Sequence, residues 1–174
     1  MIEPFNTLEN SIKSFAFASA LALSLIASAA SAQAVRTEKN MSLELANQIA
    51  AATVASCSAS GYNVTAAVVD RAGNLRALQR ADNAGPHTLG AAQGKAYTSA
   101  SARNSTGAML DNVQKNPGAA TLVDIPGFLT LGGGVPVKVG NEVIGAVGVG
   151  GAPGGHLDEA CANVGIAKVA ELLK

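Results

Sequence analysis

The sequence is poor in aromatic and histidine side chains. Of its 174 residues 3% are aromatic, none is tryptophan, and two are histidine. Lysine plus arginine and aspartate plus glutamate number 12 each, so the formal net charge is zero, and no basic run occurs. Because nucleic-acid binding depends on clustered positive charge and on aromatic stacking, the composition argues against a nucleic-acid partner.

Several catalytic signatures are missing or incomplete. The sequence has neither a G-x-S-x-G elbow nor an H-E-x-x-H helix. The run Gly90–Ala96 resembles a phosphate-binding loop, but it has one residue too few between its glycines and ends in alanine where Ser or Thr would hold magnesium. The run Gly148–Pro153 lacks the third glycine of a dinucleotide-binding turn. No catalytic residue is therefore assigned from motifs.

The first 34 residues have the pattern of a secretory signal peptide. An apolar run from Phe15 to Ala27, too short to span a bilayer, follows Lys13 and precedes small residues. Cleavage sites are possible after Ala32 or after Ala34, and the pattern does not choose between them. We expect a periplasmic or secreted protein with no membrane attachment after cleavage, in which residues 35–174 form a single domain.

Alternating helical and strand periodicities predict an α+β domain. Ser42 is a typical N-cap, Gly61 a typical helix stop, and Gly140-Asn141 a typical two-residue hairpin turn. The pattern predicts helices at 42–60, 84–103, 105–114 and 157–172, and strands at 62–70, 75–81, 128–131, 135–139 and 142–149. The expected architecture is a five-stranded antiparallel sheet with helices on both faces.

The helix expected at 84–103 has two different faces. Leu89, Ala92, Ala96 and Ala100 fall on one side, which should face the core. His87, Ala91, Gly94 and Thr98 cluster within about 60° of one another on the helical wheel. Gly90 and Gly94 each cost a helix roughly 1 kcal/mol relative to alanine, which suggests that something approaches this backbone closely. That partner is either a ligand or another helix or subunit.

The cysteines and the second histidine each allow two interpretations. Cys57 and Cys161 lie in the first and last predicted helices, where they either form a disulfide or are buried separately. His156 with Asp158 and Glu159 either binds a metal ion or leaves the two carboxylates as solvated charges at a helix start.

Five ordered blocks between residues 41 and 173 resemble the GlcG/HbpS-like family, which is also labelled haem-degrading and is similar to the C-terminal domain of PduO-type proteins. The blocks are Val69-Asp-Arg-Ala-Gly-Asn74, Gly94-Lys-Ala-Tyr-Thr98, Asp124-Ile-Pro-Gly127, Gly132-Gly-Gly-Val-Pro-Val137, and Gly145–Gly151 followed by Leu157-Asp-Glu159. The resemblance implies a profilin-like fold and homo-oligomers built through helical faces.

The resemblance also implies an exported, oligomeric haem-binding protein that carries or senses haem or iron. One exported branch of the family resembles a haem sensor that works with a kinase, so a sensor kinase is a candidate partner. One alternative is an enzyme or accessory protein acting on a small oxidised metabolite, as in glycolate or diol metabolism, with Lys95 and Asp124 as its polar groups. The other alternative is a purely structural oligomer without a small ligand.

Most candidate haem-binding residues lie on the helix expected at 84–103. The family's haem ligand is a threonine in one branch and a first-helix histidine in another, and this chain has no histidine in its first helix. Imidazole is the usual proximal donor to haem iron, which favours His87; Thr98 and Tyr97 offer oxygen instead. Lys95 and Arg103, with Arg76 and Arg80, are candidates to meet the haem propionates. Gly94 would let the ligand approach the backbone.

Overall fold

The computed structural model describes residues 35–174, so the predicted signal peptide lies outside the described residues. Residues 39–174 form one compact unit, and the described part of the preceding unit, residues 35–38, contains an ion pair between Arg36 and Glu38 (2.9 Å). Within residues 35–174, no helix has the length and apolar character needed to cross a membrane.

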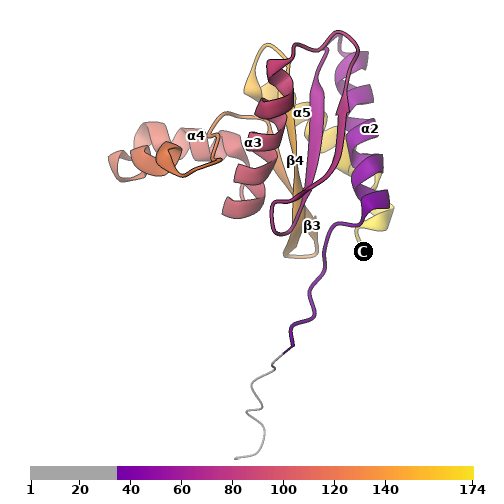
Figure 1. Ribbon diagram of the computed structural model, residues 1–174, viewed down its shortest axis with the longest axis horizontal. Helices are drawn as coiled ribbons and strands as arrows, with labels where there is room; N and C mark the ends of the chain where they lie inside the picture. The colour runs from indigo at the N-terminus through magenta and orange to yellow at the C-terminus, as the bar shows by residue number, and fades with distance from the viewer. Residues whose placement is uncertain (1–34) are drawn as a thin grey trace, which may run out of the picture. The chain divides into compact units, whose positions relative to one another are not determined.

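The helices and strands of the compact unit come in much the order that the periodicities predict (Figure 1). In chain order they are α2 (Leu43–Ala59), β1 (Thr65–Asp70), β2 (Leu75–Arg80), α3 (His87–Ala102), α4 (Thr106–Lys115), the 3-10 helix η1 (Pro117–Asp124), β3 (Gly134–Val139), β4 (Glu142–Gly150), α5 (Gly155–Lys168) and the 3-10 helix η2 (Ala170–Leu172). Ser42 and Ser105 cap α2 and α4 by accepting hydrogen bonds from backbone N–H groups three residues ahead.

The four described strands form one antiparallel sheet in the order β2-β1-β4-β3. Helices α2 and α5 pack on one face and α3 packs on the other (Figure 1). The larger apolar core lies under α2 and α5, around Ile49, Val68 and Val147. A smaller one, Val69, Ala96, Ala100 and Ala146, lies under α3. An α+β domain with an antiparallel sheet covered on both faces is therefore confirmed.

The prediction of a fifth strand at 128–131 was wrong, because this segment is an irregular connection. Its backbone groups bond to threonine side chains instead of to a neighbouring strand. Leu129 N–H donates to Thr98 Oγ1 (2.7 Å), and the carbonyl of Leu131 accepts from Thr106 Oγ1 (2.8 Å). The segment is thus bonded to α3 and α4 and does not join the sheet, which has four described strands.

A disulfide joins the first and last of the described α-helices. Cys57 of α2 and Cys161 of α5 are bonded, with their Cα atoms 5.3 Å apart. Both side chains are almost fully buried in the larger core. Of the two interpretations open from the sequence, the structure therefore has the disulfide.

Candidate functional site

Helix α3 rests directly on the central strand β4 because the contact contains no large side chain. A Cβ atom added to Gly148 would lie 2.1 Å from the carbonyl oxygen of Ala92 and 2.4 Å from the amide nitrogen of Ala96. Only glycine permits this approach, since real Cβ atoms essentially never come closer than 3.0 Å to another heavy atom. The N-terminal end of α3 is held by a hydrogen bond between Thr88 and Thr65 of β1 (2.7 Å).

The inner face of α3 also carries a buried ion pair. Lys95 Nζ donates to Asp158 Oδ2 of α5 and to the carbonyl of Val149 in β4, both at 2.8 Å. Each side chain of the pair is 3% exposed. Asp158 Oδ1 accepts in addition from the backbone of Ala152. Lys95 is thereby turned into the protein, where its ammonium group joins α3, β4 and α5.

Burial dominates the ionisation of Asp158. Removing its carboxylate from water raises its pKa above 3.8, while the hydrogen bond and the charge of Lys95 act in the opposite direction. The two partners are thus mutually dependent, because each is the counter-charge that makes the other's burial tolerable.

Thr98 is fully buried, and its hydroxyl is used twice. It donates to the carbonyl of Gly94 and accepts from the amide of Leu129, both at 2.7 Å. The helical wheel places Thr98 beside Gly94, but the connection at 127–130 covers this part of the helix. In the structure Thr98 anchors that connection to α3.

A shallow hollow of about 400 Å³ lies beside α3, against residues of β1, of β2 and of the turn between them, and we call it the α3 groove. Its lining consists mainly of glycine backbone and apolar side chains, together with one amide and one phenol: Val69, Gly73, Leu75, Gly90, Gln93, Gly94, Tyr97 and Gly127. Of the residues singled out in the sequence, the structure therefore brings Gly90, Gly94 and Tyr97 together.

The ring of Tyr97 is fixed between two turns. Gly73 and Gly127 both have a φ of +84°, and a Cβ atom on either would lie within 3.2 Å of a Tyr97 ring carbon. Phe128 packs edge-on against the same ring, with centroids 6.1 Å apart. The phenol oxygen has no hydrogen-bond partner within residues 35–174, so it is available to a ligand.

Gly90 differs from the other glycines around α3 because no packing contact requires it. A Cβ atom at Gly94 would lie 3.2 Å from Leu129, whereas a Cβ atom at Gly90 would meet nothing within 4 Å. The helix therefore bears the cost of a glycine at position 90 without an internal reason. Open space above an unexplained glycine is what a site for a closely approaching ligand needs.

His87 and Leu89, at the start of α3, lie outside the α3 groove. The His87 imidazole folds over Gly85 and lines a separate hollow of about 330 Å³ with Tyr62, Asn63 and Asn83. Leu89 is 37% exposed, so its expected place on the core face was wrong; Ala92, Ala96 and Ala100 are buried as expected. The structure thus separates His87 from Tyr97, although both are on α3.

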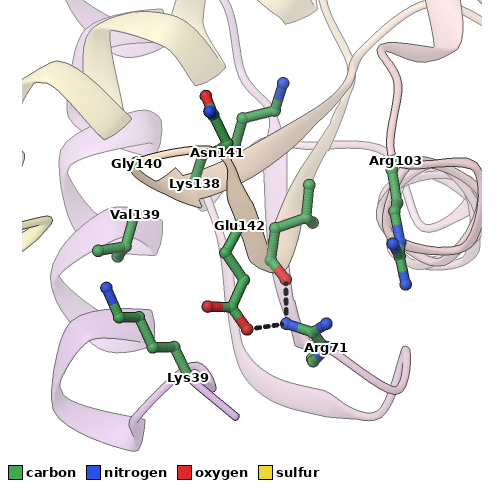
Figure 2. Close-up of a pocket in the computed structure, with 9 residues that line it drawn as sticks. Lys39, Arg71, Arg103, Lys138, Val139, Gly140, Asn141 and Glu142 are labelled. Atoms are coloured by element: carbon green, nitrogen blue, oxygen red, sulfur yellow. Dashed lines mark hydrogen bonds and ion pairs between the residues drawn. The ribbon is translucent and has the colours of Figure 1, made fainter. Parts of the chain in front are cut away.

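Arg103 and His156 lie away from the α3 groove as well. Arg103 follows the end of α3 and lines a basic hollow with Arg71 and Lys138 (Figure 2). His156, at the start of α5, lines a hollow with Asp111 and Glu159. Glu159 accepts from the amides of Gly107 and Gly133, and in the part of the chain that the structure describes no three His, Cys, Asp or Glu side chains are grouped to hold a metal ion.

Sequence reasoning missed two features of this region. It treated Asp158 as a charge at a helix start or a metal ligand, and Lys95 and Asp158, 63 positions apart, give no local signal of their pairing. It also left Gly73 and Leu75 out of the site, although Gly73 belongs to the Val69–Asn74 block that carries the family resemblance.

Comparison with known proteins gives a consistent result. The family model described as "Haem degrading protein HbpS-like" matches residues 41–167. Protein GlcG of Escherichia coli K12 is 36% identical over 115 residues, which cover 66% of this chain and 84% of GlcG. A crystal structure of a double mutant of HbpS from Streptomyces reticuli is 38% identical with a TM-score of 0.74, covering 81% of this chain and 94% of that one.

A third similar protein is known in complex with haem. The crystal structure described as the PduOC:Heme complex has a TM-score of 0.66 and covers 74% of this chain and 94% of that one. Its sequence identity to this chain is 24%, so the likeness shows a common fold alone.

Proposed function

The chain belongs to the HbpS-like family, and on this premise we propose that it is an exported, oligomeric protein that binds haem in the α3 groove and carries or senses it. The family is described by haem chemistry, and its model spans all the elements that build the groove. The observation that carries the choice of site is Gly90, a helix-weakening residue beneath open space that no internal contact explains.

The residues present in the groove fit a haem group. The open backbone at Gly90 offers a flat surface, and Val69 and Leu75 supply apolar contacts for a macrocycle. Tyr97 would offer its phenol oxygen to the iron, a ligand type found in haem proteins. When bound, haem would supply an iron centre that can change ligands or oxidation state.

The shape of the groove favours carriage or sensing over turnover. The hollow is shallow, and Leu75 and Tyr97 on its rim are partly exposed to water. A site that turns over a reactive group normally excludes water, whereas a site that hands its ligand on must leave it accessible. The partner in such an exchange would be another haem carrier or a sensor kinase.

Export and assembly rest on two further observations. A disulfide persists in oxidising compartments, so the Cys57–Cys161 bond is consistent with a periplasmic or secreted protein. The outer faces of α2 and α5 form a hollow of about 570 Å³ lined mainly by small or apolar residues such as Ala52, Ala55 and Val164. Such a face suits helix packing between subunits of a profilin-like domain, and light scattering of the purified protein would give the subunit number.

A hemin titration tests the proposed site. Wild-type protein should give a saturable Soret shift. Gly90→Leu, which places a side chain in the open space of the groove, should abolish the shift, whereas Leu89→Ala, next to it but outside the groove, should leave it intact. A folded wild-type protein that gives no shift would rule out haem binding, and a Gly90→Leu protein that binds normally would rule out the groove.

A further inference from the structure

Four cationic side chains from separate segments surround one hollow at the end of the sheet where the β3–β4 hairpin turns. Figure 2 shows Lys39, Arg71, Arg103 and Lys138 around this space, which has a volume of about 660 Å³. The only acidic residue in its described lining is Glu142. The basic hollow thus has a formal charge of three positive, in a chain whose total formal charge is zero.

The carboxylate of Glu142 is already paired with Arg71. Glu142 Oε1 accepts from Arg71 Nη1 at 2.6 Å, and the same nitrogen donates to the carbonyl of Val143. This pair holds the β1–β2 turn against β4 and fixes one wall of the hollow (Figure 2). Lys39, Arg103 and Lys138 are exposed, and none has a carboxylate partner among the described residues. Three positive charges are therefore left without counter-charges around a concave surface.

Arg103 has a backbone conformation that favours glycine. It caps the C-terminal end of α3 with φ 55° and ψ 30°, and it is the only described non-glycine residue with a positive φ. Glycine is the usual residue at this position because it lacks a Cβ atom. Arginine here lowers stability relative to glycine, and α3 would end equally well without its side chain. A role for the guanidinium group in the basic hollow explains why arginine stands there.

We propose that the basic hollow binds a small multivalent oxyanion, of the polycarboxylate or polyphosphate class. Its volume lies in the range of small-molecule sites, about 300–1,000 Å³. Arg103 can pair with two oxygens at once and the lysines act as point charges, so a ligand with several anionic oxygens satisfies more of the site than a monovalent ion does. The concave arrangement favours a compact ligand over an extended acidic chain. The inference is independent of haem binding.

Calorimetric titration at low ionic strength with citrate and with tripolyphosphate tests the proposal. We expect saturable one-to-one binding of at least one of the two, and the stronger ligand identifies carboxylate or phosphate chemistry. Lys138→Ala and Arg103→Gly should each weaken binding by about tenfold or more, the effect of losing one charge-assisted contact. Lys168→Ala, which removes an exposed lysine of α5 outside the basic hollow, should leave the affinity unchanged.

Arg103→Gly separates binding from folding. Because glycine suits the backbone at position 103, this variant should melt at a higher temperature than wild type while its anion affinity falls. The proposal is overturned if neither anion binds saturably, or if Lys168→Ala weakens binding as much as Lys138→Ala does. Binding of polyglutamate without binding of either small anion would also overturn it, in favour of an acidic polypeptide partner.

Discussion

Lys95 and Asp158 form an ion pair of 2.8 Å that is almost completely withdrawn from water. The pair connects α3, the helix that carries the α3 groove, with β4 and α5. Replacing Lys95 alone leaves a buried carboxylate without its counter-charge. We expect Lys95→Met to lower the free energy of unfolding at neutral pH by about 3–5 kcal/mol, measured by urea denaturation.

The same variant should show a pH dependence of known sign. Burial raises the pKa of Asp158 and Lys95 lowers it, so removing Lys95 raises that pKa further. A carboxyl group with a higher pKa in the folded than in the unfolded protein stabilises the fold at pH values below the unfolded pKa. This stabilisation is lost as the pH rises through the folded pKa. The deficit of Lys95→Met should therefore be largest at pH 7.5 and shrink towards pH 4.5.

The double variant Lys95→Met with Asp158→Asn is the control for this effect. Asparagine does not titrate and can still accept from the amide of Ala152, so the deficit of the double variant should not grow as pH rises over the same range. A Lys95→Met deficit that likewise does not grow with pH would show that the buried carboxylate is not its source.

Gly148 and Gly90 predict opposite responses to the same substitution. Gly148→Ala forces a methyl group against the backbone of α3, so α3 must shift, and we expect a loss of about 3 kcal/mol or more. Gly90→Ala adds a methyl group in open space and should stabilise the protein by about 0.5–1 kcal/mol. Thermal melting of both variants checks the pair, and a loss of stability in Gly90→Ala would contradict the open groove.

The helices and most of the strands could be predicted because their signals are local. The Ser42 cap, the β-rich apolar run of β1 and the turn at Gly140-Asn141 each depend on a few neighbouring residues. The segment 128–131 has an apolar composition typical of a strand, but its backbone bonds to Thr98 and Thr106 decide its conformation. Such contacts join residues about thirty positions apart and leave no trace in a local pattern.

The candidate site could be predicted only as far as its signals are local. A helical wheel identifies which residues share a side of α3. The cost of glycine in a helix pointed to Gly90 and Gly94. Such local patterns cannot show that a later segment covers Thr98, that Lys95 turns inward to Asp158, or that His87 bends back over Gly85. These outcomes depend on what packs against each part of the helix.

Tyr97 is expected to be the iron ligand within the α3 groove, because its phenol oxygen has no hydrogen-bond partner among residues 35–174, while the Thr98 hydroxyl is engaged twice. Tyr97→Phe preserves the ring between Gly73 and Gly127 and removes only the oxygen, so it should alter the Soret spectrum and weaken hemin binding without unfolding the protein. His87→Ala, titrated alongside, should keep the wild-type spectrum. A changed spectrum in His87→Ala alone would assign the iron to the other hollow.

The Cys57–Cys161 disulfide joins residues 104 positions apart, and the loop that it closes includes all four described strands and α3. A cross-link over such a distance restricts the unfolded chain strongly, so Cys57→Ala with Cys161→Ala should lower the free energy of unfolding by about 2–5 kcal/mol. Adding a reductant to wild-type protein should produce a comparable loss, whereas the double variant should not respond to it. Thiol titration of the unfolded, unreduced wild-type protein should detect no free cysteine, and two free thiols would show that the bond does not form.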